Sequence, residues 1–259
     1  MEQHLYGTLA CTALAAAFLL SGCGQTTDTT SSSHDSNFDP STPQAQIKLI
    51  VDSKALWFQS QDYANELFAY TVTDLDRNGR LELIVANMGG TGLYTYSSFY
   101  EVNETFDALE SCAYNAIEGD SQADIIIDTA PVYIDTETGS RYYVFDDLIR
   151  NGAAEYYENK RALSLEKGQI NTLPLAWKTS IYTEGNSEPE VTCIDQNQVP
   201  ISETDYDAIA NTAFEGLEQK TAHFGWYEVW GSALEDAEAL DADAWLEILH
   251  TSYDAFSLS

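Results

Sequence analysis

Hydrophobic and polar positions change their period along the chain, and these changes mark out the expected elements. From residue 44 to 58, apolar side chains recur at helical spacing after a Thr42-Pro43 pair that suits a helix start. The segments 66–73 and 81–86 are instead extended, apolar and rich in β-branched residues, with a polar turn between them. The pattern predicts an N-terminal helix followed by a β-hairpin.

The middle of the chain continues as strands and short turns. The glycine run 89–92 precedes another extended segment, 93–102, so it indicates a turn or bulge and not a phosphate-binding loop, which would need a following helix. Further pairs of extended segments flank the glycine-containing turns 136–140 and 166–169. Because strands joined by such turns are neighbours, this pattern predicts an antiparallel meander.

The C-terminal quarter returns to helical spacing. Ser202 precedes a polar-apolar segment that runs to Lys220, and Asp205 stands where a capping box usually has Glu or Gln. A last helix is expected over 241–256, with acidic residues at its positive end. We therefore expect an α+β fold, in which an antiparallel sheet (a meander) has N-terminal and C-terminal helices packed against it.

The first residues predict where the protein is located. Residues 8–20 form an uncharged apolar run, too short for a membrane-spanning helix but suited to a signal peptide. Leu20-Ser21-Gly22-Cys23 follows and resembles the lipobox of bacterial lipoproteins, which implies lipidation of Cys23. The absence of Lys and Arg before the apolar run departs from that pattern. The alternative is an ordinary secretory signal with an accidental Cys23.

The predicted signal peptide and lipidation site divide the chain into three parts. Residues 1–22 are expected to be the signal peptide, 23–43 a disordered Ser/Thr-rich tether, and 44–259 a single extracytoplasmic domain. The expected location is the cell membrane, with the protein anchored through its lipid on the extracytoplasmic face. The membrane is thus the first predicted partner.

Composition narrows the classes of partner. The 42 acidic and 11 basic residues give a formal net charge of −31, which argues against nucleic acid and against anionic lipid surfaces. The same charge favours solubility outside the cell and cation binding. Aromatic residues make up 12% of the chain, which raises the possibility of a carbohydrate ligand. The alternative is that these rings fill the core of an antiparallel sheet.

One motif carries identifiable chemistry. In residues 74–82, DLDRNGRLE, oxygen-bearing side chains occupy positions 1, 3, 5 and 9, namely those of Asp74, Asp76, Asn78 and Glu82. Glycine stands at position 6, where a calcium loop bends sharply, and Arg80 at position 7 offers its main-chain carbonyl. The pattern predicts a structural Ca²⁺ site. The alternative is an ordinary polar hairpin turn.

The loop departs from an EF-hand, because position 12 is Val85 and both flanks read as strands. It resembles the strand–loop–strand calcium loops of integrin-type propeller repeats, present here once. It is also similar to a group of Firmicutes cell-surface lipoproteins. The segments that carry this likeness are Trp57, Tyr70–Val85 and Ile194–Tyr206. The resemblance implies a surface-exposed domain and no particular activity.

Catalytic signals are weak. The sequence has neither a G-x-S-x-G nor an H-E-x-x-H motif. His223 and His250 are expected to be structural, and the adjacent acids Asp146 and Asp147 would point to opposite faces of a strand. We therefore expect a binding or structural role; the sequence does not identify the ligand, for which a carbohydrate and a protein are the two candidates. The alternative is a carbohydrate-active hydrolase that uses a carboxylate pair.

Two further features leave alternatives open. Cys112 and Cys193 are the cysteines of the expected domain, and they form either a disulfide or two buried thiols. In the segment WYEVW, Trp226 and Trp230 would share one face of a strand and form a binding platform. Core packing of these rings is the alternative, and the better supported one.

Overall fold

The computed structural model describes residues 39–58, 67–89, 94–115 and 126–259, and Asp39–Ser259 form one compact unit. The predicted signal peptide, Cys23 and most of the tether lie outside the described residues. Among the residues described, no helix is both long and apolar enough to cross a lipid bilayer. The elements, in chain order, are α1 (Pro43–Asp52), α2 (Lys54–Trp57), β1 (Leu67–Thr73), β2 (Glu82–Gly89), β3 (Tyr94–Val102), β4 (Leu109–Ser111), β5 (Ala113–Asn115), β6 (Thr129–Ile134), β7 (Arg141–Asn151), β8 (Glu155–Glu166), β9 (Gln169–Ile181), β10 (Glu190–Asp195), β11 (Pro200–Ile201), α3 (Glu203–Ala213), β12 (Glu218–His223), β13 (Tyr227–Trp230), a 3₁₀ turn (Gly231–Ala233), α4 (Leu234–Ala239), α5 (Ala242–Ala255) and β14 (Ser257–Leu258).

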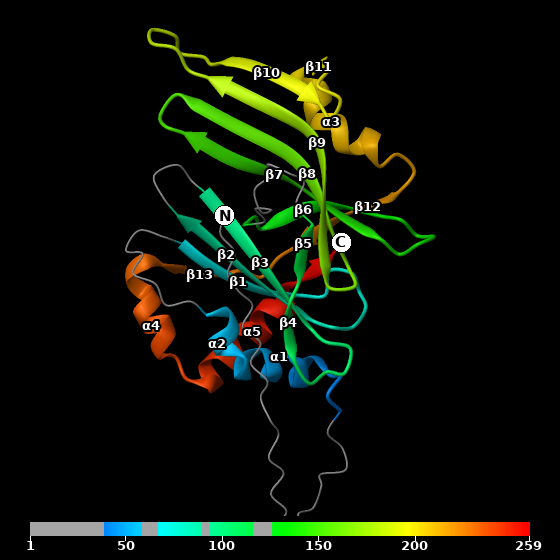
Figure 1. Cartoon of the computed structure of the whole chain (residues 1–259), viewed down its shortest axis with the longest axis vertical. Coiled ribbons are helices and arrows are strands. Elements are labelled where there is room, and N and C mark those ends of the chain that lie inside the picture. Colours follow the sequence, from blue (N-terminus) through cyan, green and yellow to red (C-terminus); the bar gives the residue numbers. More distant parts are fainter. Residues whose placement is uncertain (1–38, 59–66, 90–93, 116–125) are drawn as a thin grey trace, which may run out of the picture. The chain divides into compact units, whose positions relative to one another are not determined.

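The strands form two sheets, which stand one above the other in Figure 1. The first has five strands in the order β13-β1-β2-β3-β4. The second has nine strands, with β11-β10-β9-β8-β7-β6-β12-β14 in sequence along the sheet and β5 paired to β9. Among the described strands, all pairings are antiparallel except that of β5 with β9. The expected α+β class and meander are confirmed, but the strands divide between two sheets.

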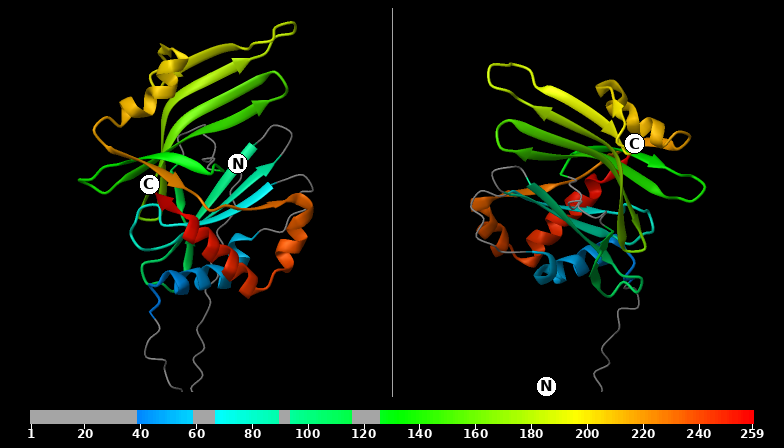
Figure 2. Two further views of the ribbon diagram at one scale, coloured as in Figure 1. Left: turned by 180° about the vertical axis from the view of Figure 1, so that it is seen from behind. Right: turned by 45° about the horizontal axis from the view of Figure 1, so that its top comes forward.

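The helices α1 and α5 cover one face of the five-stranded sheet. Figure 2 shows α1 and α5 lying beneath it, away from the nine-stranded sheet. Three rings meet edge to face at the centre of this layer, with centroids 5.2 Å apart for Trp57 and Trp245 and 5.4 Å apart for Tyr70 and Trp245. All three side chains are almost fully buried. Aromatic residues therefore fill a core here, as expected for a sheet rich in them.

A second core lies between the two sheets. Leu75, Ile84 and Phe99 from the five-stranded layer pack in one cluster with Tyr143 and Phe145 of β7. On its other face, the nine-stranded sheet is covered by α3 through a separate cluster that includes Phe214. The order of layers is thus helices, five-stranded sheet, nine-stranded sheet and α3.

Two helix predictions need correction. The N-terminal helix is interrupted at Ser53, because the carbonyl of Ile50 accepts hydrogen bonds from the Ser53 N–H and from the indole of Trp57. The helix after Ser202 begins at the predicted capping box with Asp205. It ends at Ala213, however, and the chain turns at Gly216 (φ +89°) into β12, so residues 218–220 are strand. The last helix agrees with its prediction to within a residue at each end.

One close approach sets the position of α5. A Cβ added to Gly225 would lie 2.4 Å from the carbonyl oxygen of Ser252 and 2.7 Å from the Cβ of Ala255. The carbonyl oxygen belongs to the main chain of α5, and the Cβ is bonded directly to that main chain. Neither atom can therefore move aside by a side-chain rotation. Glycine is required because α5 contacts the main chain at this point.

We predict that Gly225→Ala destabilises the fold by about 1–3 kcal/mol through overpacking, which corresponds to several degrees in Tm for a domain of this size. Differential scanning calorimetry measures the change. Thr221→Ala, at an exposed position on the adjoining strand β12, is the matched control and should leave Tm nearly unchanged. Equal Tm values for Gly225→Ala and wild type would contradict the close approach.

Candidate metal centre

The loop between β1 and β2 is shaped by its own side chains. Asp76 Oδ1 accepts a hydrogen bond from the Asn78 N–H (3.1 Å), and Asp74 Oδ1 accepts one from the Gly79 N–H (3.4 Å). Arg77 and Gly79 have positive φ angles of 60° and 84°, so both adopt the left-handed backbone conformation found in tight turns. The DLDRNG sequence therefore folds its acids toward the inside of the turn.

The turn brings three carboxylates together. One oxygen atom from each of Asp74, Asp76 and Glu82 lies within 4.8 Å of the other two, and this group could hold a metal ion. Asp74 and Glu82 are buried, with 8% and 0% of their surfaces exposed, and Asp76 is partly exposed. Oxygen atoms at these separations can coordinate a single hard cation.

Glu82 is the buried centre of the group. Its Oε2 accepts hydrogen bonds from the Leu75 N–H (2.7 Å) and from the Thr73 hydroxyl (3.0 Å). Within the described part of the chain, its Oε1 is buried and has no hydrogen-bond partner. An unpartnered buried carboxylate oxygen is costly, so it needs either a proton or a cation.

The pKa values of the three acids reflect this environment. Burial raises the pKa of Glu82 well above its usual range, and the nearby Asp76 and Asp74 carboxylates raise it further. Burial is also the main cause of the raised pKa of Asp74 and of Asp76. Burial and mutual repulsion therefore disfavour the ionised forms of these acids. A bound cation would reverse this preference.

Two of the predicted ligands, Asn78 and Arg80, form hydrogen bonds or ion pairs with other groups of the protein. The Asn78 amide nitrogen donates to Asp76 Oδ2 (2.8 Å) and to Glu101 Oε1 (2.9 Å), while its oxygen accepts from the Arg80 N–H (2.7 Å). The Arg80 guanidinium forms an ion pair with Glu101 at 2.7 Å. The amide oxygen of Asn78 keeps a second lone pair, so its role as a ligand stays a prediction, as does that of the Arg80 carbonyl.

Sequence reasoning missed the residues that hold the loop from outside. Gln46 of α1 donates through Nε2 to the Gly79 carbonyl and accepts at Oε1 from the Leu81 N–H, both at 2.8 Å. From β7, Tyr143 donates its hydroxyl to the Leu75 carbonyl (2.7 Å). Arg141 donates Nη1 to the Asp76 carbonyl, also at 2.7 Å. The loop is thus bound to a helix and to the second sheet.

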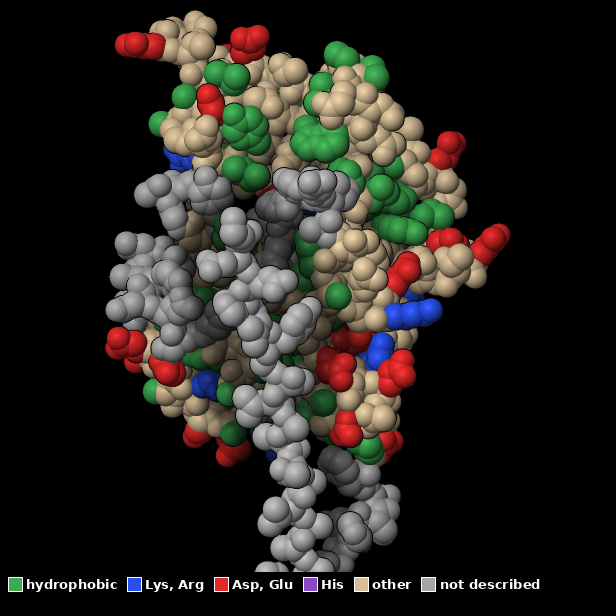
Figure 3. All heavy atoms as spheres, viewed as in Figure 1, with side chains coloured by type: hydrophobic (Ala, Val, Ile, Leu, Met, Phe, Trp, Pro, Cys, Tyr) green, Lys and Arg blue, Asp and Glu red, His purple; other side chains and the backbone are tan. Residues whose placement is uncertain are grey.

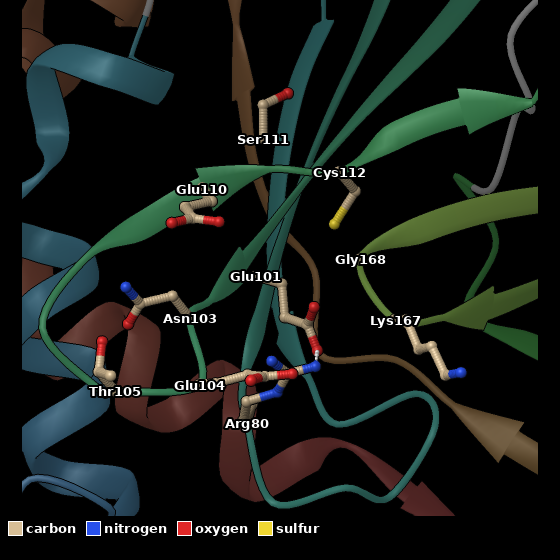
Figure 4. Close-up of a pocket in the computed structure, with 10 residues that line it drawn as sticks. All are labelled: Arg80, Glu101, Asn103, Glu104, Thr105, Glu110, Ser111, Cys112, Lys167 and Gly168. Atoms are coloured by element: carbon tan, nitrogen blue, oxygen red, sulfur yellow. Dashed lines mark ion pairs between the residues drawn. The ribbon is translucent and has the colours of Figure 1, made fainter.

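A polar surface cavity of about 380 Å³ adjoins the loop (Figure 4). The Arg80–Glu101 ion pair forms part of its wall, and the sulfur of Cys112 lies near it. Exposed acids at positions 104 and 110 and the exposed Lys167 lie around it, so its charges are mixed. Through Glu101 and Asn78, the cavity wall is connected to the three-carboxylate group.

The cysteines and acids assigned elsewhere do not assemble into a second site. Cys112 is a half-buried and Cys193 a buried free thiol, so the disulfide considered from the sequence is not formed. Asp146 and Asp147 lie on opposite faces of β7, as expected. Asp146 is exposed and pairs with Lys160, whereas Asp147 is buried and pairs with Arg161. They are not a working carboxylate pair.

The histidines are structural in setting, although His223 lies on β12 and not on a helix. Its Nε2 is 3.0 Å from the hydroxyl of Ser259, and His250 lies partly buried within α5. The predicted structural role of both histidines is consistent with these positions.

The two tryptophans of WYEVW have different environments. Trp226 precedes β13, stacks on Phe224 with centroids 6.2 Å apart, and donates its indole N–H to the Ile127 carbonyl (2.9 Å). Trp230 lies on the edge strand β13 and is 60% exposed. The prediction that these rings pack in the core is therefore met in part by Trp226 and is wrong for Trp230. Because only Trp230 is within the strand, strand alternation does not align the two rings.

Outside the site, acidic side chains are spread over the face shown in Figure 3, and basic ones are few. This agrees with acids that mostly solvate the surface. The three-carboxylate group differs from them because it is largely buried.

We predict that, in a chelator, the domain loses stability as pH rises above the ordinary carboxyl range. The reason is the raised pKa of Glu82: its protonated form contributes stability below the unfolded-state pKa, and this contribution is lost as pH rises through the folded-state pKa. Thermal unfolding between pH 4 and pH 8 measures the loss.

Glu82→Gln should flatten this profile, because a neutral amide replaces the titrating group at the same size. Asp195→Asn is the control, since Asp195 is a partly exposed acid at the end of β10 whose pKa is lowered by hydrogen bonds, first of all from the Val199 N–H. Parallel profiles for wild type and Glu82→Gln would show that Glu82 is not the group responsible.

Comparison of the chain with known protein families, with curated proteins and with solved structures gives no match. The resemblance to Firmicutes lipoproteins therefore stays a prediction, and the function has to be inferred from the site itself.

Proposed function

We propose that this protein is a lipid-anchored extracytoplasmic protein whose domain binds one calcium ion in the loop 74–82. The apolar run 8–20 and the Leu20–Cys23 lipobox support the address. The order of oxygen ligands around Gly79 supports calcium. The ion stabilises the fold, and the domain has a binding or structural role at the cell surface.

The observation that carries the proposal is the Oε1 atom of Glu82. It is fully buried, lacks a hydrogen-bond partner among the described residues, and belongs to a carboxylate whose neighbours are two further acids. An ordinary polar hairpin turn has no reason to bury a third acid behind its two turn aspartates. A cation would satisfy this oxygen and would also relieve the repulsion between the three carboxylates.

Calcium fits the donor set better than other common metals. Every ligand offered is oxygen, which suits hard cations, whereas zinc and copper sites use histidine or cysteine. Magnesium demands near-ideal octahedral geometry and keeps several waters, while calcium accepts the irregular geometry of a main-chain turn. An exported domain also meets calcium more readily than a cytoplasmic one.

A structural role is favoured over a catalytic one. The loop is held through main-chain carbonyls by Gln46, Tyr143 and Arg141, so a bound ion would fix a point where three elements meet. The ligand Glu82 has no exposed surface through which a substrate could approach it. Among the described residues, the adjacent acids Asp146 and Asp147 do not support the hydrolase alternative, because they lie on opposite faces of β7.

We predict that calcium raises the thermal stability of the unlipidated chain, prepared as Cys23→Ser. A single-site ligand at about 100 times its Kd stabilises by about 2.7 kcal/mol, which corresponds to several degrees in Tm. Calorimetric unfolding with and without calcium measures the shift. Magnesium at the same concentration should give a smaller shift, because its geometric demands are stricter.

Two isosteric variants, Asp76→Asn and Glu82→Gln, should lose the calcium-induced shift, since each removes one charged ligand. Asp195→Asn is the matched control: Asp195 also accepts backbone N–H groups within an exposed turn, from Asn197 and Val199, but it has no partner acids in a metal-binding group. A calcium shift that survives in both loop variants would place the ion elsewhere, and no shift in the parent chain would refute the site.

The lipid anchor makes a separate prediction. Cells that express the unaltered chain should incorporate labelled palmitate into it and retain it in the membrane fraction. Cys23→Ser should remove the label, because the thiol is the group that accepts the lipid. Release without any labelling of the parent chain would indicate an ordinary secretory signal.

A further inference from the structure

The loop and the nine-stranded sheet are joined at Leu75. The hydroxyl of Tyr143 donates a buried hydrogen bond of 2.7 Å to the Leu75 carbonyl. The N–H of the same residue donates to Glu82 Oε2, also at 2.7 Å. Both Leu75 and Tyr143 have no exposed surface, and their side chains belong to the core cluster between the sheets. Leu75 is therefore held by its main chain and its side chain at once.

This residue lies between two of the three acids. Because Leu75 separates Asp74 from Asp76, the orientation of its two peptide groups sets the direction in which both carboxylates leave the chain. Its N–H bond also fixes the carboxylate of Glu82. A single main-chain position thus orients the whole three-carboxylate group, and Tyr143 of β7 fixes that position from the opposite sheet.

We infer that Tyr143 is a positioning residue of the metal centre, and that calcium binding and the docking of β7 onto the loop are thermodynamically linked. This inference rests on the proposed function. A cation that draws Asp74, Asp76 and Glu82 together holds the Leu75 carbonyl toward Tyr143. The bond from Tyr143, in return, keeps the three carboxylates in place before the cation arrives. Linkage requires these two effects to be equal in free energy.

Arg141 contacts the same loop but acts in two opposing ways. Its Nη1 donates to the Asp76 carbonyl, which helps to hold the loop. Its positive charge, however, lowers the pKa of Asp74 and Asp76, as a cation in the site would, so it repels that cation. Tyr143 is neutral and has no such charge effect. It therefore provides the cleaner test of positioning.

The test compares two tyrosine-to-phenylalanine variants of the unlipidated chain by calorimetric titration with calcium chloride. Tyr143→Phe removes the bond to Leu75. Tyr133→Phe is the matched control, because Tyr133 is a buried tyrosine on the neighbouring strand β6 whose hydroxyl donates to Asn211 Oδ1 (2.6 Å), away from the loop.

Calcium affinity should fall about tenfold in Tyr143→Phe, in the range seen when groups that orient metal ligands are removed, and should stay within about twofold in Tyr133→Phe. Equal affinity in Tyr143→Phe and the parent chain overturns the inference but leaves the calcium site intact. Absence of calcium binding in the parent chain overturns both the proposed function and the inference.

Hydrogen exchange on the parent chain tests the linkage without any variant at Tyr143. Calcium should slow amide exchange in residues 141–146 of β7 as well as in residues 73–82, and more strongly than in β10 at the far part of the nine-stranded sheet. Protection confined to residues 73–82, or no greater in β7 than in β10, overturns the inference. This measurement decides the question even if Tyr143→Phe does not fold.

Discussion

A carboxylate that is cut off from water, that of Glu82, is the constraint on which the architecture around it depends. Removing a carboxylate from water costs on the order of several kcal/mol unless partners replace the lost hydration. One of its oxygens is satisfied by the Leu75 N–H and the Thr73 hydroxyl, and the other lacks a partner among the described residues. The neighbouring Asp74 and Asp76 increase the demand for positive charge. The fold thus concentrates negative charge at the point where its two sheets and first helix meet.

The positive charges of the surrounding arginines compensate only part of the negative charge of Asp74, Asp76 and Glu82. Arg77, Arg80 and Arg141 all lie near the loop, and each lowers the pKa of at least one of its aspartates. Within the part of the chain that the structure describes, none of them donates a hydrogen bond to a carboxylate of the three-carboxylate group. Arg80 is paired instead with Glu101, and Arg77 lies over the ring of Phe256. The arginines therefore moderate the field of the acids without forming ion pairs with the three carboxylates among the described residues.

The ligand residues could be predicted because their arrangement is local. Alternation within nine residues and a single glycine determine which side chains of 74–82 turn inward, and the structure brings Asp74, Asp76 and Glu82 together. Two supporting residues left a weaker signal. Gln46 is a polar residue on the apolar face of a predicted helix, and Glu101 shares the face of Phe99 in a predicted strand. In both cases periodicity placed a polar group where an apolar one was expected.

Tyr143 and Arg141 left no such signal, since their contacts with the loop are made across some 65 residues of chain by the packing of one sheet on another. The same non-local pairing divides the strands into two sheets, which hairpin patterns alone do not reveal. The two helix ends were misjudged at local turns, at Ser53, where the Ile50 carbonyl accepts from the Trp57 indole, and at Gly216. The environment of Trp230 likewise depends on β13 being an edge strand, which follows from topology and not from sequence.

The topology also constrains the order in which the strands pair during folding. The segment 218–230 supplies β12 to the nine-stranded sheet and, a few residues later, β13 to the five-stranded sheet. Each of these strands pairs with a partner far earlier in the chain, β6 and β1 respectively. Contacts so distant in sequence close slowly, because the entropy of the long intervening loop is lost before they form. The edge of β1 that pairs with β13 therefore stays unpaired until the last quarter of the chain is present, and the two sheets are completed together, at the end.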